Sequence, residues 1–170
     1  MDSADNTIRD ETKREIDPCN MHVDNEGDWY YQGNKIIREE ILELFYDNLQ
    51  LSPEGQFLIE WRQTRCALDV EDTPFVISRV ERCRTADTGE EKILLSLKHL
   101  SLQDTLDPTG LHVGKDNVLY CRVLSGRFPA RFSRPAYYHF AEWIEEDPAT
   151  GAFYVEINNK RHVIRTPVEA

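Results

Sequence analysis

Four arginines lie within one short stretch of this sequence, residues 117–141, which contains neither aspartate nor glutamate although the whole chain carries a net charge of −11. A guanidinium group binds phosphate or carboxylate through two parallel hydrogen bonds, and an aromatic face stacks on a base or another flat ring. The stretch holds Arg122, Arg127, Arg131 and Arg134, together with Tyr120, Phe128, Phe132, Tyr137, Tyr138 and Phe140. These residue types favour a site for a small anionic ligand such as a nucleotide.

Two arginines, Arg38 and Arg134, hold matching places in an internal repeat whose two parts are 96 residues apart. Each is expected at or just before the first turn of a helix, where a cation opposes the helix dipole at a cost of about 0.3–1 kcal/mol. One explanation is an anion held jointly by the arginine and the helix N-terminus. The other is structural: a salt bridge between the repeats, to Glu60, Glu156 or Asp72, while the remaining arginines neutralise acids and the aromatic rings fill the core.

The repeat also indicates the architecture, because self-similarity at a fixed spacing points to duplicated structural units. In each part a helical stretch ends in a turn that contains proline and glycine. A strand then follows, Gly55–Glu60 in the first part and Gly151–Glu156 in the second. We therefore expect two related modules that meet face to face, with a groove between them as the place for a ligand.

The predicted fold is α+β, with two related strand–helix–hairpin modules, antiparallel sheets and two main helices. We expect residues 1–18 to form a polar tail, residues 19–74 the N-terminal module and residues 75–170 the C-terminal module. The helices are expected from Arg38 to about Leu49, and from the N-cap residue Ser133 to about Glu146. Alternation and turn residues predict a first hairpin, Met21–Val23 with Trp29–Gln32, and a last hairpin, Ala152–Ile157 with His162–Arg165.

Composition excludes several classes of function. With 31 acidic against 20 basic residues, the surface repels phosphate backbones, so general binding to DNA or RNA is not expected. No run of 18 apolar residues exists, so we expect no membrane-spanning segment, and the polar N-terminus lacks the apolar region of a secretory signal. The four cysteines, Cys19, Cys66, Cys83 and Cys121, form no CxxC pair, which indicates free thiols in a reducing cytoplasm.

No motif of a known catalytic or cofactor site is present, neither a phosphate-binding glycine loop nor a G-x-S-x-G or H-E-x-x-H pattern. Cys19 and His22 have the spacing of zinc ligands but lack a second pair, so we expect no metal and no cofactor. His139, in the second helix, could act as a base, but no motif sets a partner for it. An enzyme assembled from scattered residues is therefore the least favoured alternative.

Three runs of the sequence resemble a bacterial family of unknown function, domain-of-unknown-function family 1285. They are Asp28–Ile36, Val70–Val76 and Phe132–Tyr138, and the resemblance extends from about Met21 to Pro167. It implies a duplicated α+β module whose C-terminal part is similar to a pleckstrin-homology-type barrel, with a nucleotide-like ligand in the groove between modules and a role in signalling. Carried over to this sequence, the resemblance implies a groove lined by Trp29, Tyr30, Arg38, Arg134 and Tyr137.

The sequence therefore predicts a cytoplasmic, non-catalytic binding protein that holds a small anionic, nucleotide-like ligand between its two modules. The predicted ligand-binding residues are Arg38, Arg127, Arg131 and Arg134 for the charged groups, with Trp29, Tyr30 and Tyr137 around the ring. The first alternative is a protein-interaction module that uses a barrel edge or an exposed aromatic patch near Phe128 and Phe132. The second is an enzyme, which a histidine against a carboxylate in a deep cleft would favour.

Overall fold

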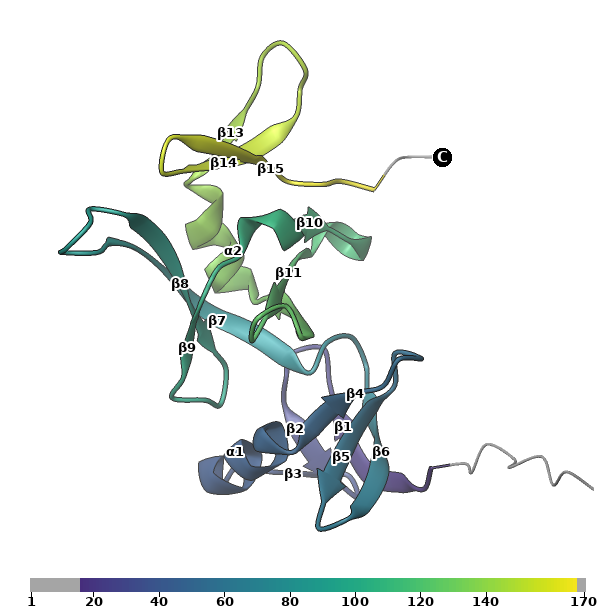
Figure 1. Ribbon diagram of the computed structural model, residues 1–170. Helices are drawn as coiled ribbons and strands as arrows, with labels where there is room; N and C mark the ends of the chain where they lie inside the picture. Colours follow the sequence, from purple (N-terminus) through teal and green to yellow (C-terminus); the bar gives the residue numbers. More distant parts are fainter. Residues whose placement is uncertain (1–15, 168–170) are drawn as a thin grey trace, which may run out of the picture.

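The structure is a computed structural model of the chain, and it describes residues 16–167. Three β-sheets follow one another along an elongated molecule, with helix α1 beside the first sheet and helix α2 beside the second (Figure 1). Of the predicted polar tail, residues 1–15 lie outside the described part, and Pro18 already opens the first strand. In residues 16–167, no helix is long and apolar enough to cross a membrane.

The first sheet has six strands in the order β3-β2-β1-β6-β5-β4. Its strands are β1 (Pro18–Val23), β2 (Trp29–Tyr31), β3 (Asn34–Lys35), β4 (Leu49–Leu51), β5 (Phe57–Trp61) and β6 (Thr64–Val70), and helix α1 (Glu39–Asp47) joins β3 to β4. Leu42 and Tyr46 lie about one helical turn apart and are both buried. Because Glu39 and Glu40 remain exposed, α1 is amphipathic and contributes one apolar face to the core.

The second sheet has six strands, in the order β10-β11-β12-β7-β8-β9, and the third has three, in the order β13-β14-β15. They are β7 (Phe75–Arg84), β8 (Glu91–Leu97), β9 (Gln103–Thr105), β10 (His112–Val113), β11 (Leu119–Val123), β12 (Phe128–Phe132), β13 (Ile144–Glu146), β14 (Phe153–Ile157) and β15 (Lys160–Val163). Helix α2 (Arg134–Ala141) begins at an N-cap, where the Ser133 hydroxyl accepts from the backbone N–H of Ala136. Two short 3-10 turns, η1 (Pro108–Gly110) and η2 (Lys115–Asn117), flank β10.

The predicted α+β fold, with two related modules and two main helices, is confirmed with three differences. Both six-stranded sheets are mixed rather than antiparallel, because β1 pairs in parallel with β6, and β7 pairs in parallel with β12. No sheet within the described part of the chain closes into a barrel. The second helix ends at Ala141 rather than near Glu146, because residues Ile144–Glu146 pair with β14 instead.

The internal repeat recurs strand by strand. Strands β5 and β14 have the same length and lie 96 residues apart, and each forms the first arm of a hairpin with the same register. The hairpin before each helix recurs as well, with His22 opposite Tyr30 in β1–β2 and His112 opposite Tyr120 in β10–β11. We refer to residues 18–70 as the first copy and to residues 112–166 as the second copy.

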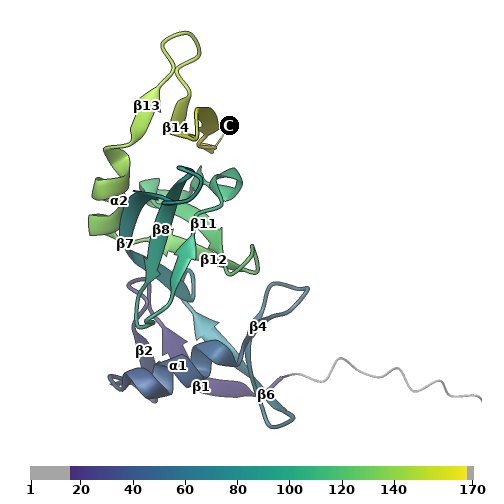
Figure 2. The same cartoon turned by 60° about the vertical axis from the view of Figure 1, so that its left-hand side comes forward.

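The two copies differ in how their halves are joined. In the first copy β1 runs in parallel beside β6, from the pair of Pro18 and Ala67 onward, so that all six strands form one sheet. In the second copy the corresponding junction is a single bridge between His112 and Arg165. The hairpin β10–β11 therefore belongs to the second sheet, while β13–β15 form a separate sheet at the far end of the molecule (Figure 1, Figure 2).

Buried aromatic rings connect the first copy to the second sheet. Trp29 and Tyr46 meet edge to face, and the indole N–H of Trp29 donates to the Tyr46 hydroxyl over 3.0 Å. The Tyr46 hydroxyl in turn donates to the carbonyl of Pro74 over 2.8 Å, and the Tyr46 ring packs on Phe75 of β7. Phe75 then contacts Phe128 of β12. One continuous row of rings thus joins the two sheets.

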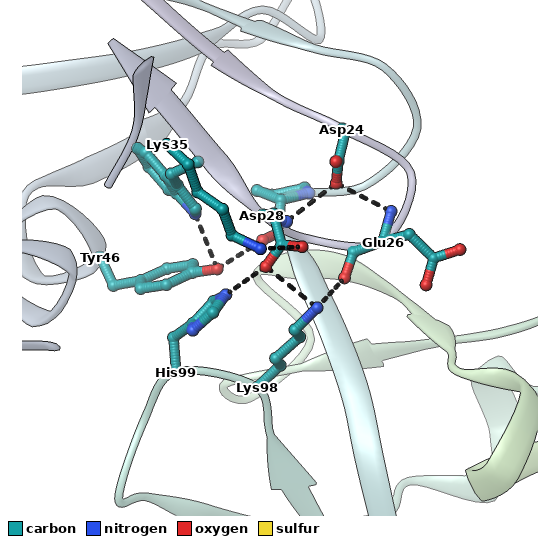
Figure 3. Close-up of polar contacts among 9 residues, drawn as sticks. Asp24, Glu26, Asp28, Lys35, Tyr46, Lys98 and His99 are labelled. Carbon is teal, nitrogen blue, oxygen red and sulfur yellow. Dashed lines mark hydrogen bonds and ion pairs between the residues drawn. The ribbon is translucent and has the colours of Figure 1, made fainter. Parts of the chain in front are cut away.

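Asp28 links the same two parts by charge (Figure 3). Its carboxylate accepts from Lys35 over 2.9 Å within the first copy, and Lys98 and His99, directly after β8, each lie 3.1 Å from it. Lys98 also donates to the carbonyl of Glu26 over 2.8 Å. Burial alone would raise the pKa of Asp28, but the hydrogen bonds and charges of Lys35 and Lys98 outweigh it and lower that pKa below its usual value.

Cys19 and Cys66 form a disulfide between β1 and β6, so the prediction of four free thiols is wrong for this pair. Parallel pairing of the two strands brings these residues to a Cα–Cα distance of 4.9 Å, which their sequence separation of 47 conceals. Cys83 and Cys121 are free. Cys19 and Cys66 therefore no longer count as evidence that the protein resides in a reducing cytoplasm.

We expect that breaking this disulfide destabilises the protein. A cross-link that closes a loop of this length restricts the unfolded chain and contributes on the order of 3–4 kcal/mol to the free energy of unfolding. Cys19→Ser should therefore unfold at a lower urea concentration than the wild type, and a reducing agent should shift the wild type by a similar amount. Cys83→Ser is the control, because this cysteine is free. Equal unfolding midpoints for the oxidised and reduced protein would contradict the assignment.

Asp28→Asn should lower the free energy of unfolding by about 2 kcal/mol near neutral pH, because hydrogen bonds to charged groups contribute about 1.5–3 kcal/mol. Since the pKa of Asp28 is lowered in the folded state, its contribution is complete above the unfolded-state pKa of about 3.9 and is lost as the pH falls through the folded-state pKa. Urea unfolding of variant and wild type should converge over that acidic range. Asp87→Asn is the control, because Asp87 is exposed and has no hydrogen bond or ion pair within the described residues. A difference that is constant with pH would refute the prediction.

Candidate ligand-binding site

The cavity found where the first copy meets the second sheet has no arginine in its lining. It has a volume of about 310 Å³ and is bordered by Glu43, Asp47, Leu100 and Leu102, among others, and its charged lining residues are both acidic. The row of rings and the Asp28 network occupy the neighbouring contact. Carboxylates repel an anion, so the structure does not support the predicted location of the ligand.

Three of the predicted ligand-binding residues, Trp29, Tyr30 and Arg127, have unrelated surroundings in the structure. Trp29 is fully buried and stacks on Phe45, so neither face of its ring is open to a ligand. Tyr30 borders a surface cavity of about 590 Å³ in the first copy. Arg127 is exposed and lies over the ring of Phe128, 5.2 Å from its centre. The structure thus gives Trp29 a role in the core, and it separates Tyr30 and Arg127 from the other predicted residues.

Arg38 and Arg134 do not hold equivalent places in the two copies, so this part of the predicted repeat is wrong. In α1 the carbonyl of Arg38 accepts the first-turn N–H of Leu42, and in α2 the carbonyl of Ser133 accepts that of Tyr137. These hydrogen bonds align Arg38 with Ser133, a shift of 95 residues. The shift becomes 96 only after the turn before β14, which is one residue longer than the turn before β5.

Arg131, Arg134 and Tyr137 do lie together, around a cavity of about 370 Å³ at the N-terminal end of α2. Within residues 16–167, Arg134 is exposed and makes no ion pair. Arg131 is held by Asp72 over 2.7 Å, and the same carboxylate accepts from the Tyr120 hydroxyl over 2.8 Å. Burial and that hydrogen bond raise the pKa of Tyr120 to about 12, so its hydroxyl remains a donor. Arg134 is therefore free to bind a ligand, while Arg131 is already fixed in place.

A larger cavity, of about 520 Å³, adjoins the first and shares Asn117, Leu119 and Tyr137 with it. It lies between the hairpin β10–β11, helix α2 and the third sheet. Its apolar lining residues include Val113, Leu119, Ala141, Ile144, Phe153 and Ile164. We refer to the smaller cavity as the arginine cavity and to the larger one as the apolar cavity.

The apolar cavity occupies the place that the hydrophobic core holds in the first copy. The strand registers and helix hydrogen bonds align these six lining residues, in the order given, with residues of the first copy that form its core or, for Phe57, pack against it: Val23, Trp29, Tyr46, Leu49, Phe57 and Leu68. At two of these positions the second copy has a much smaller side chain than the first, because Leu119 aligns with Trp29 and Ala141 aligns with Tyr46. Without those two rings, a close-packed interior is left with a space that its neighbours do not fill.

The charge around this site also differs between the copies. The same alignment places Val118 where the first copy has Asp28, and Arg134 where it has Glu39. Two carboxylates of the first copy thus correspond to an apolar residue and an arginine in the second. Asp116 remains as an acidic residue beside the arginine cavity. The change of charge favours an anion at Arg134.

Reasoning from the sequence missed the residues that shape the apolar cavity, namely Leu119, Ala141 and Asn117. None of them carries a charge or belongs to a motif. The signal that would have found them is a residue-by-residue comparison of the two copies, with a shift of 90 residues for the first hairpin and 95 for the helix. That comparison needs the register of the strands, which the structure supplies.

The structure gives little support to the two alternative functions, an enzyme and a protein-interaction module. His22 and Asp69 form a histidine–carboxylate pair, with 2.7 Å between Nδ1 and Oδ2, but their side chains are 42% and 77% exposed. They border the cavity of about 590 Å³ in the first copy, whose lining contains no serine, threonine or cysteine as a nucleophile. Phe128 and Phe132 are buried and cannot themselves contact a protein partner, whereas Tyr138, which borders the same cavity as Phe132, is exposed. Across the described ranges, no cluster of three or more His, Cys, Asp or Glu side chains could hold a metal ion.

Two crystal structures of DUF1285 family proteins share the fold of this chain. One, from Silicibacter pomeroyi DSS-3, aligns with a TM-score of 0.71 and 20% sequence identity over 88% of this chain and 81% of that chain. The other, from Shewanella baltica OS155, aligns with a TM-score of 0.59 and 20% identity over 72% of this chain and 90% of that chain. The resemblance suggested by the sequence is thus confirmed at the level of the fold. No protein-family model and no curated protein matches the sequence.

Proposed function

We propose that the protein binds a small anionic ligand with a flat, nucleotide-like ring in the two adjoining cavities of its second copy. The ring enters the apolar cavity, and the anionic group meets Arg134 in the arginine cavity. The observation that carries the proposal is the pair of large-to-small differences, from Trp29 to Leu119 and from Tyr46 to Ala141, at a place where the first copy has two buried rings.

The apolar cavity suits a ring in size and in lining. Its volume of about 520 Å³ lies within the usual range for small-molecule sites. Tyr137 is half-buried between the two cavities and offers a ring face, for which aromatic contacts contribute about 0.5–1.5 kcal/mol beyond the burial of apolar area. A bound ring would regain the contacts that Trp29 and Tyr46 make in the first copy.

The arginine cavity supplies the positive charge through side chains rather than through the helix N-terminus. The Ser133 hydroxyl already accepts the N–H of Ala136, and Pro135 has no N–H to offer. An anion would therefore be bound by the guanidinium of Arg134, with Arg131 as a fixed second cation. Because a guanidinium binds a phosphate or carboxylate through two hydrogen bonds, a phosphate or carboxylate is the expected anionic group.

The lining of the two cavities favours binding over catalysis. Among the described residues it includes no histidine, serine or cysteine, and its one threonine, Thr166, has no histidine in the lining to act as its base. We therefore expect a ligand that binds and leaves unchanged.

The proposal can be tested with a panel of nucleotides and phosphorylated metabolites, read by thermal shift. A ligand present at 100 times its dissociation constant adds about 2.7 kcal/mol of stability to the folded state. Arg134→Ala should weaken binding roughly tenfold to a hundredfold, because it removes charge-assisted hydrogen bonds of about 1.5–3 kcal/mol. Arg127→Ala is the matched control, because Arg127 is exposed and lies outside both cavities.

The double variant Leu119→Trp, Ala141→Tyr gives the second copy the ring pair of the first copy. It should stay folded, at least as stable as the wild type, and lose binding of every ligand found in the panel, because the two rings fill the cavity. Leu119→Ile is the control that keeps the volume of the side chain and should keep binding. A double variant that binds as tightly as the wild type, or a panel in which nothing raises the melting temperature, would sink the proposal.

A further inference from the structure

The two adjoining cavities differ in charge: Arg131, Arg134 and Asp116 line the arginine cavity, whereas Glu146 is the one charged residue among the described residues that line the apolar cavity. Arg134 borders the arginine cavity at the start of α2, and Glu146 borders the apolar cavity beyond the end of that helix, in β13. Tyr137 and Ala141 line the site between them. Since α2 has eight residues, it alone spans about 12 Å. A ligand that extends along the site therefore meets a cation at one end and a carboxylate at the other.

Glu146, Thr166 and Asn117 bring polar groups to the apolar cavity that the first copy lacks. The corresponding first-copy residues are Leu51, Val70 and Gly27. Glu146 is exposed at the edge of the apolar cavity, and within the described part of the chain its carboxylate has no hydrogen bond or ion pair, whereas its neighbour Glu145 accepts from the Tyr154 hydroxyl over 2.9 Å. Covering a free carboxylate with a hydrocarbon edge would cost free energy.

We infer that the ring of the ligand carries two adjacent N–H donors on the edge that reaches Glu146, as the guanine base does, and that Glu146 determines this preference. The inference rests on the function proposed above and names the class of ring. A carboxylate has only acceptors, and its two oxygens can receive a pair of parallel N–H bonds. A ring edge of acceptors would instead face a negative charge. The ligand then has one orientation, with its anionic group at Arg134 and its donor edge at Glu146.

Guanosine monophosphate and inosine monophosphate test this directly, because the second lacks only the 2-amino group of the first. In calorimetric titrations of the full chain, guanosine monophosphate should bind about tenfold more tightly, since it forms one more hydrogen bond to a charged acceptor. Glu146→Leu, which introduces the first-copy residue, should remove the difference between the two nucleotides. Glu145→Gln is the matched control in the same strand and should preserve it. Glu146→Gln, which keeps the shape of the side chain, should reduce the preference as well.

Each outcome decides between the two claims. Equal affinities for the two nucleotides in the wild type would overturn the role of Glu146 and leave the proposed function standing. If phenyl phosphate or another ring phosphate binds and neither purine nucleotide does, the role of Glu146 is likewise overturned and the proposed function stands. Circular dichroism should first show that Glu146→Leu and Glu146→Gln are folded. If these variants still prefer guanosine monophosphate tenfold, a residue other than Glu146 recognises the ring edge, and the role of Glu146 is overturned. If no compound binds, the proposed function fails together with this inference.

Discussion

The hydrogen bond between the Trp29 indole and the Tyr46 hydroxyl, made by two rings packed edge to face, is the interaction on which the rest of the structure depends. It fills the interior of the first copy. Through the Tyr46 hydroxyl it also fixes the carbonyl of Pro74, where the chain leaves that copy for β7. Buried N–H and O–H groups cost free energy unless they are bonded, so these groups stabilise one another. The second copy has Leu119 and Ala141 at these places, and its interior stays open.

The two copies therefore differ in how tightly their parts are joined. In the first, the parallel pairing of β1 with β6, the disulfide and the Asp28 contacts with Lys98 hold the unit closed against the second sheet. In the second, the single bridge between His112 and Arg165 joins the hairpin to the strands after α2, and the apolar cavity lies between these parts. Duplication thus supplies a stable frame, and smaller core residues in one copy leave the cavity in which we propose that a ligand binds.

The class of fold and the repeat could be predicted because turn and strand patterns depend on neighbouring residues, and these patterns recur in the sequence. Arg131, Arg134 and Tyr137 were predicted together for the same reason, since they belong to one short segment. The burial of Trp29 could not be predicted, because it depends on contact with Tyr46 across a helix and a strand. The disulfide likewise depends on the parallel pairing of β1 and β6, which no local pattern indicates.

The claim that the second copy has an open interior is tested most directly by the reactivity of a thiol placed in it. In a Cys83→Ser background, the Ala141→Cys variant would be compared with Ala130→Cys, since Ala130 is fully buried in β12. Reaction with a small maleimide depends on access to the thiolate, and Cys121 is buried in both variants. The account predicts rapid modification at position 141 and protection at position 130. Equal protection at both positions would show that the interior of the second copy is closed, and would contradict the account.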